Sequence, residues 1–250
     1  MAENRFYYLY LMCYHTALRE KQKEVYEQVF DIHLNLESEL LPLHFHQNGF
    51  DRQNVLIITQ EDSEHVQLAK WGIAPPESDI EAYWKKVGGG SLNNRDDKFF
   101  TTAPEWKDES LLYKKCLIIV DGLYEPHKVS NAKPIPYLFE QENQALFALL
   151  GIYTEHDEMF TCSVITTSAD PLFEEIHNGA KRMPMCVDPL DKDYYLNMTK
   201  EHDIRAEFIN FRSIKLNAHP VNRDALNSHV KSDREDIVEK VYYPELDSLF

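Results

Sequence analysis

The chain has 250 residues, of which 43% are hydrophobic and 27% charged, and its formal net charge at pH 7 is −16. This length accommodates one large domain with a sizeable core, and no stretch approaches the roughly 20 apolar residues that a membrane-spanning helix needs. The composition excludes a helical membrane protein. The acidity argues against a protein that coats long strands of nucleic acid, although a small basic groove remains compatible with it.

The N-terminal part of the chain predicts a strand, a helix and a loop. Residues 7–18 are rich in Tyr and Leu and alternate loosely, which predicts a strand that contains Cys13. Residues 21–30 place apolar side chains at helical spacing. The loop that follows has turn chemistry at Asn48-Gly49.

A β-hairpin and a helix are predicted next. Residues 54–59 (NVLIIT) are strongly β-branched, residues 66–74 form a second strand, and Pro75-Pro76 ends it. Residues 80–86 predict a helix that Gly88-Gly89-Gly90 closes. Because no Gly-Lys-Ser/Thr follows the triple glycine, we interpret it as a flexible joint and not as a phosphate-binding loop.

The rest of the chain predicts short strands with helices between them. The expected strands are 116–120, 136–139, 145–153 and 160–167, and the expected helices are 170–177, 191–201 and 233–241. These elements do not alternate regularly as they would in a parallel βαβ sheet. The sequence therefore predicts an α+β fold with a mixed, barrel-like β-sheet core and surrounding helices.

The four cysteines predict neither a disulfide framework nor a metal site. Cys13, Cys116, Cys162 and Cys186 contain no CxxC pair and are not densely spaced. We therefore expect no metal and no cofactor, and a reducing cytoplasm as the setting of the protein.

Several short motifs follow one another in a fixed order, although none of them indicates a reaction alone. A single cysteine near an N-terminus, for example, is more often a small buried hydrophobe than a nucleophile. The order is Met12-Cys13, Trp71-Gly72-Ile73-Ala74-Pro75, Asn93-Asn94-Arg95, Asp121-Gly122-Leu123-Tyr124-Glu125, Thr166, His177 with Arg182-Met183-Pro184, and His219-Pro220-Val221. This succession resembles the SRAP (SOS response-associated peptidase) family from residue 12 to about residue 222.

The resemblance implies a function in the DNA damage response and in DNA repair. Members of this family form a covalent DNA–protein crosslink at abasic sites, so the implied partner is single-stranded DNA that contains abasic sites. AP-lyase activity and self-cleavage are implied as accompanying activities. We expect a monomer in the cytoplasm that joins the nucleoid upon DNA damage.

The resemblance also implies one SRAP domain over residues 1–250. Its core would span residues 12–222, with a helical C-terminal tail over residues 223–250. Residues 1–12 would be a leader or the result of a misassigned translation start.

In this family the cysteine is the first residue of the mature chain, and the chemistry explains why. An abasic site exists partly as an open aldehyde. A free α-amino group forms a Schiff base with it, and the thiol of the same residue then closes a five-membered thiazolidine ring. The α-amine has a pKa of about 7.7–8.0, so a useful fraction of it is neutral near pH 7.

This chain departs from the family at that point, because eleven residues precede Met12 and Cys13 is internal. Two interpretations stay open. Translation begins at Met12, which is then removed because a small residue follows it; this is the interpretation we prefer. Alternatively, residues 1–12 are a leader that is cleaved. Both predict that the active chain begins at Cys13.

The resemblance assigns catalytic roles to four further residues. Glu125 would position and deprotonate the α-amine, and His177 would shuttle protons, since imidazole titrates near neutral pH. Asn93 would hydrogen-bond the opened sugar or the peptide around the nucleophile. Thr166 lies eleven residues before His177, the spacing of the family's active-site threonine, and Thr167 is the alternative.

Three residues are predicted to contact DNA. Arg95 would hold a phosphate next to the lesion through its guanidinium group. Trp71 would stack on an exposed base, a contact worth about 1–3 kcal/mol; the alternative is that Trp71 packs in the core. His15 stands where the family has an arginine near the phosphate.

Other departures from the family pattern affect the expected DNA affinity more than the fold. Asp97 stands in place of a glutamate, and Pro126 in place of a tryptophan. Three extra residues separate His177 from Arg182. No proposed catalytic group is lost.

Two other functions stay open on the same residues. The first is a thiol-dependent peptidase in which Cys13, His177 and Glu125 form a triad-like arrangement. The second is a non-catalytic binding module on the same fold, which the acidity and the missing arginine favour. A DNA adduct that survives denaturation would separate the covalent function from both.

Overall fold

Five strands close into a barrel within the molecule. The computed structural model describes residues 14–130, 132–157 and 159–249. The barrel strands are β3 (Asn54–Thr59), β4 (Val66–Trp71), β6 (Lys115–Val120), β9 (Phe147–His156) and β10 (Met159–Ser168). β10 pairs with β4 in parallel and with β9 in antiparallel orientation, and the antiparallel pairs β4–β3, β3–β6 and β6–β9 complete the ring.

The apolar runs of the sequence explain this barrel. Every residue of β6 (KCLIIV) is buried, because one face lines the barrel and helices cover the other. Its one charged residue, Lys115, donates from Nζ to Gln60 Oε1 and to the Met198 carbonyl oxygen, which offsets the cost of burial. Gly151 of β9 lets β10 approach closely, because a Cβ atom would lie 2.6 Å from the Ser163 carbonyl oxygen.

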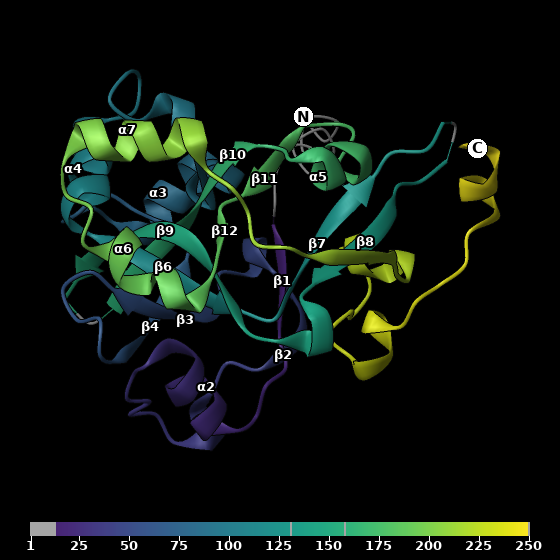
Figure 1. Ribbon diagram of the computed structural model, residues 1–250, viewed down its shortest axis with the longest axis horizontal. Coiled ribbons are helices and arrows are strands. Elements are labelled where there is room, and N and C mark those ends of the chain that lie inside the picture. Colours follow the sequence, from purple (N-terminus) through teal and green to yellow (C-terminus); the bar gives the residue numbers. More distant parts are fainter. Residues whose placement is uncertain (1–13, 131, 158, 250) are drawn as a thin grey trace.

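A second, antiparallel sheet lies beside the barrel. Its order is β13 (Asn217–Pro220), β8 (Ile135–Glu140), β7 (Gly122–His127), β1 (His15–Leu18) and β2 (His44–Asn48). Figure 1 shows β7 and β8 to the right of the barrel strands. Only Asp121 separates β6 from β7, so one short segment carries the chain from the barrel into the second sheet.

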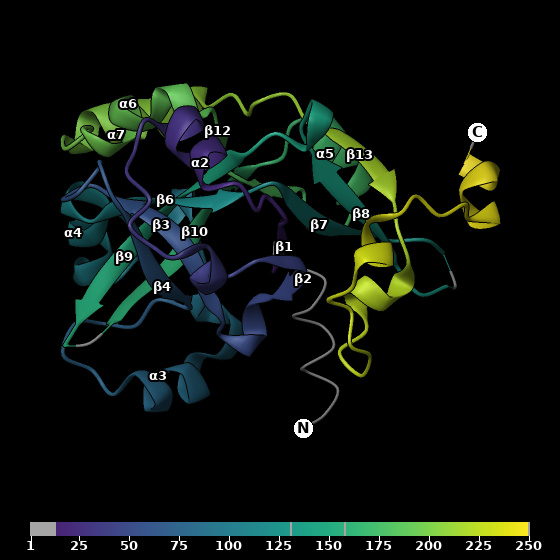
Figure 2. The same ribbon diagram turned by 90° about the horizontal axis from the view of Figure 1, so that it is seen from below.

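Helices and short strands surround the barrel. α6 (Lys192–Leu196) and α7 (Glu201–Asn210) lie on one side and α3 (Ile80–Val87) on the other, as Figure 2 shows. The other helices are α2 (Lys23–Phe30), α4 (Glu105–Tyr113) and α5 (Pro171–Ile176), and the short strands are β5 (Asn93–Arg95), β11 (Arg182–Pro184) and β12 (Cys186–Val187). This arrangement confirms the predicted α+β fold with a mixed, barrel-like core. Among the residues that the structure describes, no helix has the length and apolar character to span a membrane.

The predicted strands are largely confirmed. The hairpin is present as β3 and β4, although β4 ends at Trp71. The four later strands correspond to β6, β8, β9 and β10. The strand expected over residues 7–18 is described only from residue 14, as β1, and residues 7–13 lie outside the described residues. The polar strand β2 and the helices α4 and α7 were not predicted.

The predicted helices are confirmed in part. The helices expected over 21–30, 80–86 and 170–177 are present as α2, α3 and α5. The helix expected over 191–201 is wrong as one unit, because α6 ends at Leu196 and α7 begins at Glu201.

The C-terminal segment packs against the second sheet as short 3-10 turns and not as the predicted helical tail. The helix expected over 233–241 is wrong, since only Glu235–Val238 forms a turn there. Asp233 accepts the Phe45 backbone N–H at 2.8 Å, which ties this segment to β2. Ala225 and Ile237 are buried in a small apolar cluster with residues of β1, β7 and β8.

Candidate active site

A buried glutamate and a buried histidine lie in contact between β7 and α5. Glu125 belongs to β7, and His177 is the C-terminal capping residue of α5. His177 Nδ1 lies 3.2 Å from Glu125 Oε2, and neither side chain has exposed surface. In this low-dielectric environment the carboxylate and the imidazole interact more strongly than they would in water.

The surroundings of His177 fix which ring nitrogen carries the hydrogen. Nδ1 lies 3.2 Å from the Glu125 carboxylate and 3.1 Å from the Arg182 carbonyl oxygen. Both of these groups are acceptors, so Nδ1 is the donor. Nε2 is buried and has no hydrogen-bond partner in the described part of the chain. In the neutral ring, Nε2 is therefore available to accept a proton from a bound molecule.

Three hydrogen bonds hold the end of α5 against the end of β7. His127 donates from Nδ1 to the Ile176 carbonyl oxygen at 3.0 Å. The Lys128 backbone N–H donates to Asn178 Oδ1, and Asn178 Nδ2 donates to the Lys128 carbonyl oxygen, both at 3.0 Å. We call these four residues the β7–α5 clamp. Because its members flank the buried pair on both elements, the clamp sets the distance between the carboxylate and the imidazole.

The three extra residues after His177 form a turn that leaves this contact intact. The backbone N–H groups of Ala180 and Lys181 donate to the His177 carbonyl oxygen at 3.3 and 3.2 Å. Lys181 adopts a left-handed φ of 52° and reverses the chain direction. Arg182 then enters β11 with its carbonyl oxygen against His177. The longer loop therefore still brings the motif that follows it into contact with His177.

Arg182 connects this pair to Thr166. Its Nε and Nη2 atoms each lie 3.3 Å from Thr166 Oγ1, and Nη2 donates to Asp96 Oδ1 at 2.7 Å. Thr166 donates from Oγ1 to the Asn94 carbonyl oxygen at 3.3 Å, which fixes its orientation. Thr167 instead donates to Asp96 Oδ2 at 2.6 Å. Of the two candidate threonines, Thr166 is thus the one that Arg182 links to the buried pair.

No role was predicted for the Arg182 side chain, although the residue was recognised as part of a motif. Its side chain is 11% exposed and pairs with a carboxylate that is also largely buried. An arginine directly before the apolar pair Met183-Pro184 is the signal that could have indicated a buried cation.

β5 carries Asn93 and Arg95 along the edge of β10. The two strands run in parallel, with Asn93 opposite Val164 and Arg95 opposite Thr166. Asn93 is buried, whereas the Arg95 side chain is 46% exposed. Arg95 binds both carboxylate oxygens of Asp97 at 2.8 Å. The structure therefore places Asn93 in the buried part of the candidate active site and Arg95 at the surface of the site.

The predicted stacking of a base on Trp71 is wrong. Trp71 is 2% exposed and belongs to the main hydrophobic core. Its Nε1 donates to the Leu92 carbonyl oxygen at 3.0 Å. An indole with both faces covered cannot receive a base, so the core-packing alternative is confirmed.

The predicted phosphate contact of His15 is also wrong. His15 is buried and stacks on His46, with ring centroids 4.9 Å apart. Burial lowers the pKa of His15 to about 4. At pH 7 its imidazole is therefore neutral and supplies no positive charge for a phosphate.

The predicted nucleophile, Cys13, lies outside the described residues. Burial raises the thiol pKa of the other cysteines, so none of them is suited to form a thiolate; they are Cys116, Cys162 and Cys186. Within the described ranges, no group of three or more His, Cys, Asp or Glu side chains is arranged to hold a metal ion.

Comparison with known proteins identifies a matching family and named relatives. Residues 12–228 match the family described as SOS response associated peptidase (SRAP). The abasic site processing protein YoqW of Bacillus subtilis (strain 168) is 29% identical over 193 residues, which cover 74% of this chain and 80% of that protein. The abasic site processing protein YoaM of the same organism is 30% identical over 139 residues, which cover 53% of this chain and 57% of that protein.

Solved structures share the fold. A protein from Bacteroides thetaiotaomicron superposes with a TM-score of 0.77 at 23% identity, covering 92% of this chain and all (100%) of its own. A protein from Bordetella bronchiseptica superposes with a TM-score of 0.67 at 20% identity, covering 84% of this chain and 100% of its own.

Proposed function

This chain belongs to the SRAP family, and on that premise we propose that it processes abasic sites in DNA. The observation that carries the proposal is the buried Glu125–His177 pair, which Arg182 links to Thr166. The names of the Bacillus subtilis relatives, abasic site processing proteins, support it.

The proposed reaction is covalent capture through Cys13 once residues 1–12 are absent. The α-amine attacks the open aldehyde, and a Schiff base forms as the aldehyde oxygen leaves as water. The thiol sulfur then bonds to the same carbon, its proton moves to the nitrogen, and the thiazolidine ring closes. The high thiol pKa of the buried cysteines supports Cys13 as the nucleophile.

Glu125 and His177 divide the proton transfers of this reaction. Glu125 takes the proton that the α-ammonium group must lose before it attacks. Glu125 passes that proton to the aldehyde oxygen and is a carboxylate again. His177 keeps its Nδ1–H on this carboxylate, accepts at Nε2 the second proton that the nitrogen loses, and then donates it to the departing hydroxyl group. The carboxylate stabilises the positive charge that the ring carries in between, as an orienting carboxylate does in a catalytic triad.

Asn93 and Thr166 form the wall against which the opened sugar lies. The Thr166 hydroxyl is held by Arg182 and by the Asn94 carbonyl oxygen, so its position does not depend on substrate. Asn93 is carried by the adjacent strand and offers an amide to the sugar or to the peptide around the nucleophile.

Arg95 provides the phosphate contact at the surface of the site. Because its guanidinium already binds Asp97 in bidentate fashion, a phosphate has to share or displace that carboxylate. The resulting contact is short-ranged and moderate in strength, in keeping with a net charge of −16.

The same intermediate supports two further activities. A Schiff base at the opened sugar permits β-elimination, which is AP-lyase activity. The peptidase alternative uses Cys13 as nucleophile with His177 as its base, and self-cleavage before Cys13 is its expected product.

We also propose that residues 12–222 and the C-terminal segment act as one domain. The burial of Ala225 and Ile237 against the second sheet supports this, because removal of the segment would expose that apolar cluster.

The test uses protein that begins at Cys13, with its N-terminus verified by intact mass. It is incubated at pH 6–8 with a single-stranded oligonucleotide that carries one abasic site, and the products are separated on a denaturing gel. We expect a slowly migrating adduct, and none with Cys13→Ser. Absence of an adduct, or equal adduct formation by Cys13→Ser, contradicts covalent capture. Cysteine-dependent peptide cleavage without an adduct favours the peptidase.

A further inference from the structure

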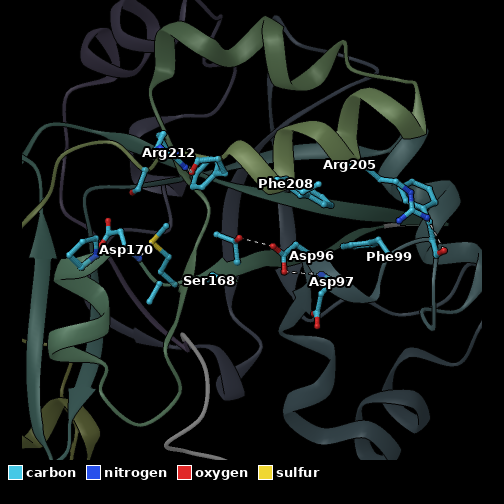
Figure 3. Close-up of a pocket in the computed structure, with 16 residues that line it drawn as sticks. Asp96, Asp97, Phe99, Ser168, Asp170, Arg205, Phe208 and Arg212 are labelled. Atoms are coloured by element: carbon cyan, nitrogen blue, oxygen red, sulfur yellow. Dashed lines mark hydrogen bonds between the residues drawn. The ribbon is translucent and has the colours of Figure 1, made fainter.

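A cavity of about 670 Å³ lies next to the candidate active site. Its walls come from the segment after β5, the loop between β10 and α5, and the C-terminal half of α7. Figure 3 shows Phe208 pointing from α7 toward Asp96, with Asp170 and Arg205 toward opposite ends. This volume lies within the range of about 300–1,000 Å³ that small-molecule sites occupy.

The cavity shares a wall with the candidate active site. Asp96 lines the cavity and also accepts a hydrogen bond from Arg182, which contacts Thr166. Arg95, the proposed phosphate contact, directly precedes Asp96. If the abasic site of a DNA strand lies at Thr166, the nucleotide next to it therefore lies at the cavity.

The aromatic lining suits a flat ligand. The rings of Phe99 and Phe208 lie with their centroids 6.2 Å apart. The Arg205 guanidinium lies over the Phe100 ring, 5.0 Å from its centroid. Aromatic rings and guanidinium planes are the two kinds of surface on which nucleic-acid bases stack.

Phe100 is held firmly in this wall. Its backbone has a left-handed φ of 56°, which residues other than glycine rarely adopt. Its N–H donates to Asp108 Oδ1 at 2.8 Å, and its carbonyl oxygen accepts from Arg205 Nη2 at 2.9 Å. These bonds fix the stacked pair of ring and guanidinium before any ligand arrives, which lowers the cost of binding.

Three carboxylates decide which kind of base the cavity prefers. Asp96, Asp97 and Asp170 line the cavity together with Arg205 and Arg212, and Asp97 is paired with Arg95 and Asp96 with Arg182. Carboxylates accept hydrogen bonds from the exocyclic amino groups of adenine, cytosine and guanine, whereas thymine has no amino group. The lining therefore offers the amino group of a base hydrogen-bond acceptors beside the aromatic rings.

We propose that this cavity binds the base of the nucleotide next to the abasic site, and that it prefers bases with an amino group over thymine. The inference rests on the proposed function and names a recognition site for it. The base stacks on Phe208, and its phosphate stays outside near Arg95. Stacking supplies affinity that does not depend on positive charge, which suits so acidic a chain.

The experiment measures binding separately from chemistry. The full chain, as purified from cells, is titrated with fluorescent single-stranded oligonucleotides that carry a tetrahydrofuran site, which has no aldehyde. The nucleotide on each side in turn carries cytosine, thymine or no base, and binding is read by anisotropy. On one side we expect loss of the base to raise Kd about 5- to 140-fold, from a stacking contribution of about 1–3 kcal/mol. Thymine should bind more weakly than cytosine there.

Two variants test whether the base binds in the cavity. Phe208→Leu keeps apolar volume but removes the ring, so it should weaken binding of the cytosine oligonucleotide and make it insensitive to base removal. Arg205→Gln should reduce the same sensitivity without changing the core. Tyr113→Ala is the matched control, because Tyr113 is an exposed aromatic residue (59%) that does not line the cavity. Thermal melting by circular dichroism verifies the folding of each variant.

The outcomes separate this inference from the proposed function. The cavity proposal is overturned if Kd does not depend on the neighbouring base. It is also overturned if Phe208→Leu and removal of the base raise Kd independently, so that their free-energy effects add in full. Adduct formation on a true abasic oligonucleotide is measured in parallel. Base-dependent binding without an adduct contradicts covalent capture and leaves the cavity proposal standing; an adduct without base dependence does the reverse.

Discussion

Two buried carboxylates lie four residues apart where the chain leaves the barrel, Asp121 directly before β7 and Glu125 within it, and their partners differ. Asp121 accepts a hydrogen bond from Arg19 Nε at 2.8 Å, and Arg19 also contacts Glu140 at 2.9 Å. Glu125 lies against His177, a residue type that gains and loses a proton near neutral pH. Asp121 is therefore part of the framework, whereas Glu125 is suited to proton transfer.

The comparison teaches that burial alone does not identify a catalytic carboxylate. Asp121 and Glu125 are equally hidden, at 1% and 0% exposure. Burial raises the pKa of Asp121, and the permanently charged Arg19 guanidinium opposes that rise. An imidazole with a free ring nitrogen can pass a proton onward, and this difference in partner separates the two roles.

The largest expected effect comes from Glu125→Gln, which removes the proton acceptor and keeps the shape. We expect the rate of adduct formation to fall about 10²- to 10⁴-fold, the usual contribution of general acid–base catalysis. The measurement is the initial rate on denaturing gels under single-turnover conditions. An unchanged rate would assign Glu125 to the framework together with Asp121.

Asp121→Ala probes the other buried carboxylate. Loss of one partner of a buried ion pair costs about 3–5 kcal/mol, and we expect a value near the lower limit because Arg19 keeps Glu140. Urea denaturation measures the free energy of unfolding, and the adduct rate of the folded fraction should stay near that of the unchanged chain. The comparison breaks down if this variant loses activity while its stability is unaffected.

The pH dependence of the free energy of unfolding tests whether the histidines buried next to β7 are neutral in the folded chain. His15 lies opposite Tyr124, and burial lowers the pKa of His15 to about 4 and that of His46 further. In the unfolded chain these histidines take up a proton near pH 6.5, whereas in the folded chain they stay neutral. The stability that their neutral form contributes is therefore fully present above pH 6.5 and is lost as the pH falls from 6.5 toward 4. Between pH 6.5 and pH 5 we expect a loss of about 2 kcal/mol per buried histidine.

Urea denaturation at pH 7 and pH 5 measures this loss. His15→Phe removes one titrating group and keeps a ring in the stack, so its stability should depend less steeply on pH. Equal curves for both proteins would show that His15 does not contribute.

The smallest expected effect comes from Asn178→Ala, which opens the β7–α5 clamp. Loss of its two hydrogen bonds should cost about 1 kcal/mol of stability and about tenfold in adduct rate, since a tenfold change corresponds to about 1.4 kcal/mol. A positioning role should also shift the pH–rate profile, because the distance between Glu125 and His177 changes. Asn178→Asp keeps the acceptor for the Lys128 N–H, so its stability and adduct rate should lie between those of the unchanged chain and those of Asn178→Ala. A uniform loss of activity with an unshifted profile would indicate a purely structural residue.

The sequence predicted the barrel better than the second sheet for a physical reason. β3 and β6 are β-branched, apolar runs that both faces of a closed barrel require. β2 (HFHQN) buries His46 and Gln47, and a strand with polar residues inward resembles a loop in sequence. Its burial depends on contacts with the neighbouring strand β1, such as the stack of His46 on His15, which spacing along one segment does not reveal.

The candidate site shows the same division. The motifs located Glu125, His177 and Thr166, because the residue types themselves carry the chemistry. They did not show that Arg182 joins these residues, nor that Trp71 is covered on both faces. Exposure and bridging contacts depend on segments far apart in the chain, so they follow only from the packed structure.

The central place of β10 has a consequence for how the molecule loses activity. β10 pairs with β4, β5, β9 and β11, so it carries Thr166 and aligns the strands of Asn93 and Arg182. Its amide hydrogens should exchange with solvent only when the whole ring opens, and local fraying will not reach the site. A variant destabilised within the barrel is then a mixture of fully competent and fully unfolded molecules. Its specific activity measures how many molecules are folded, and not how well each one works.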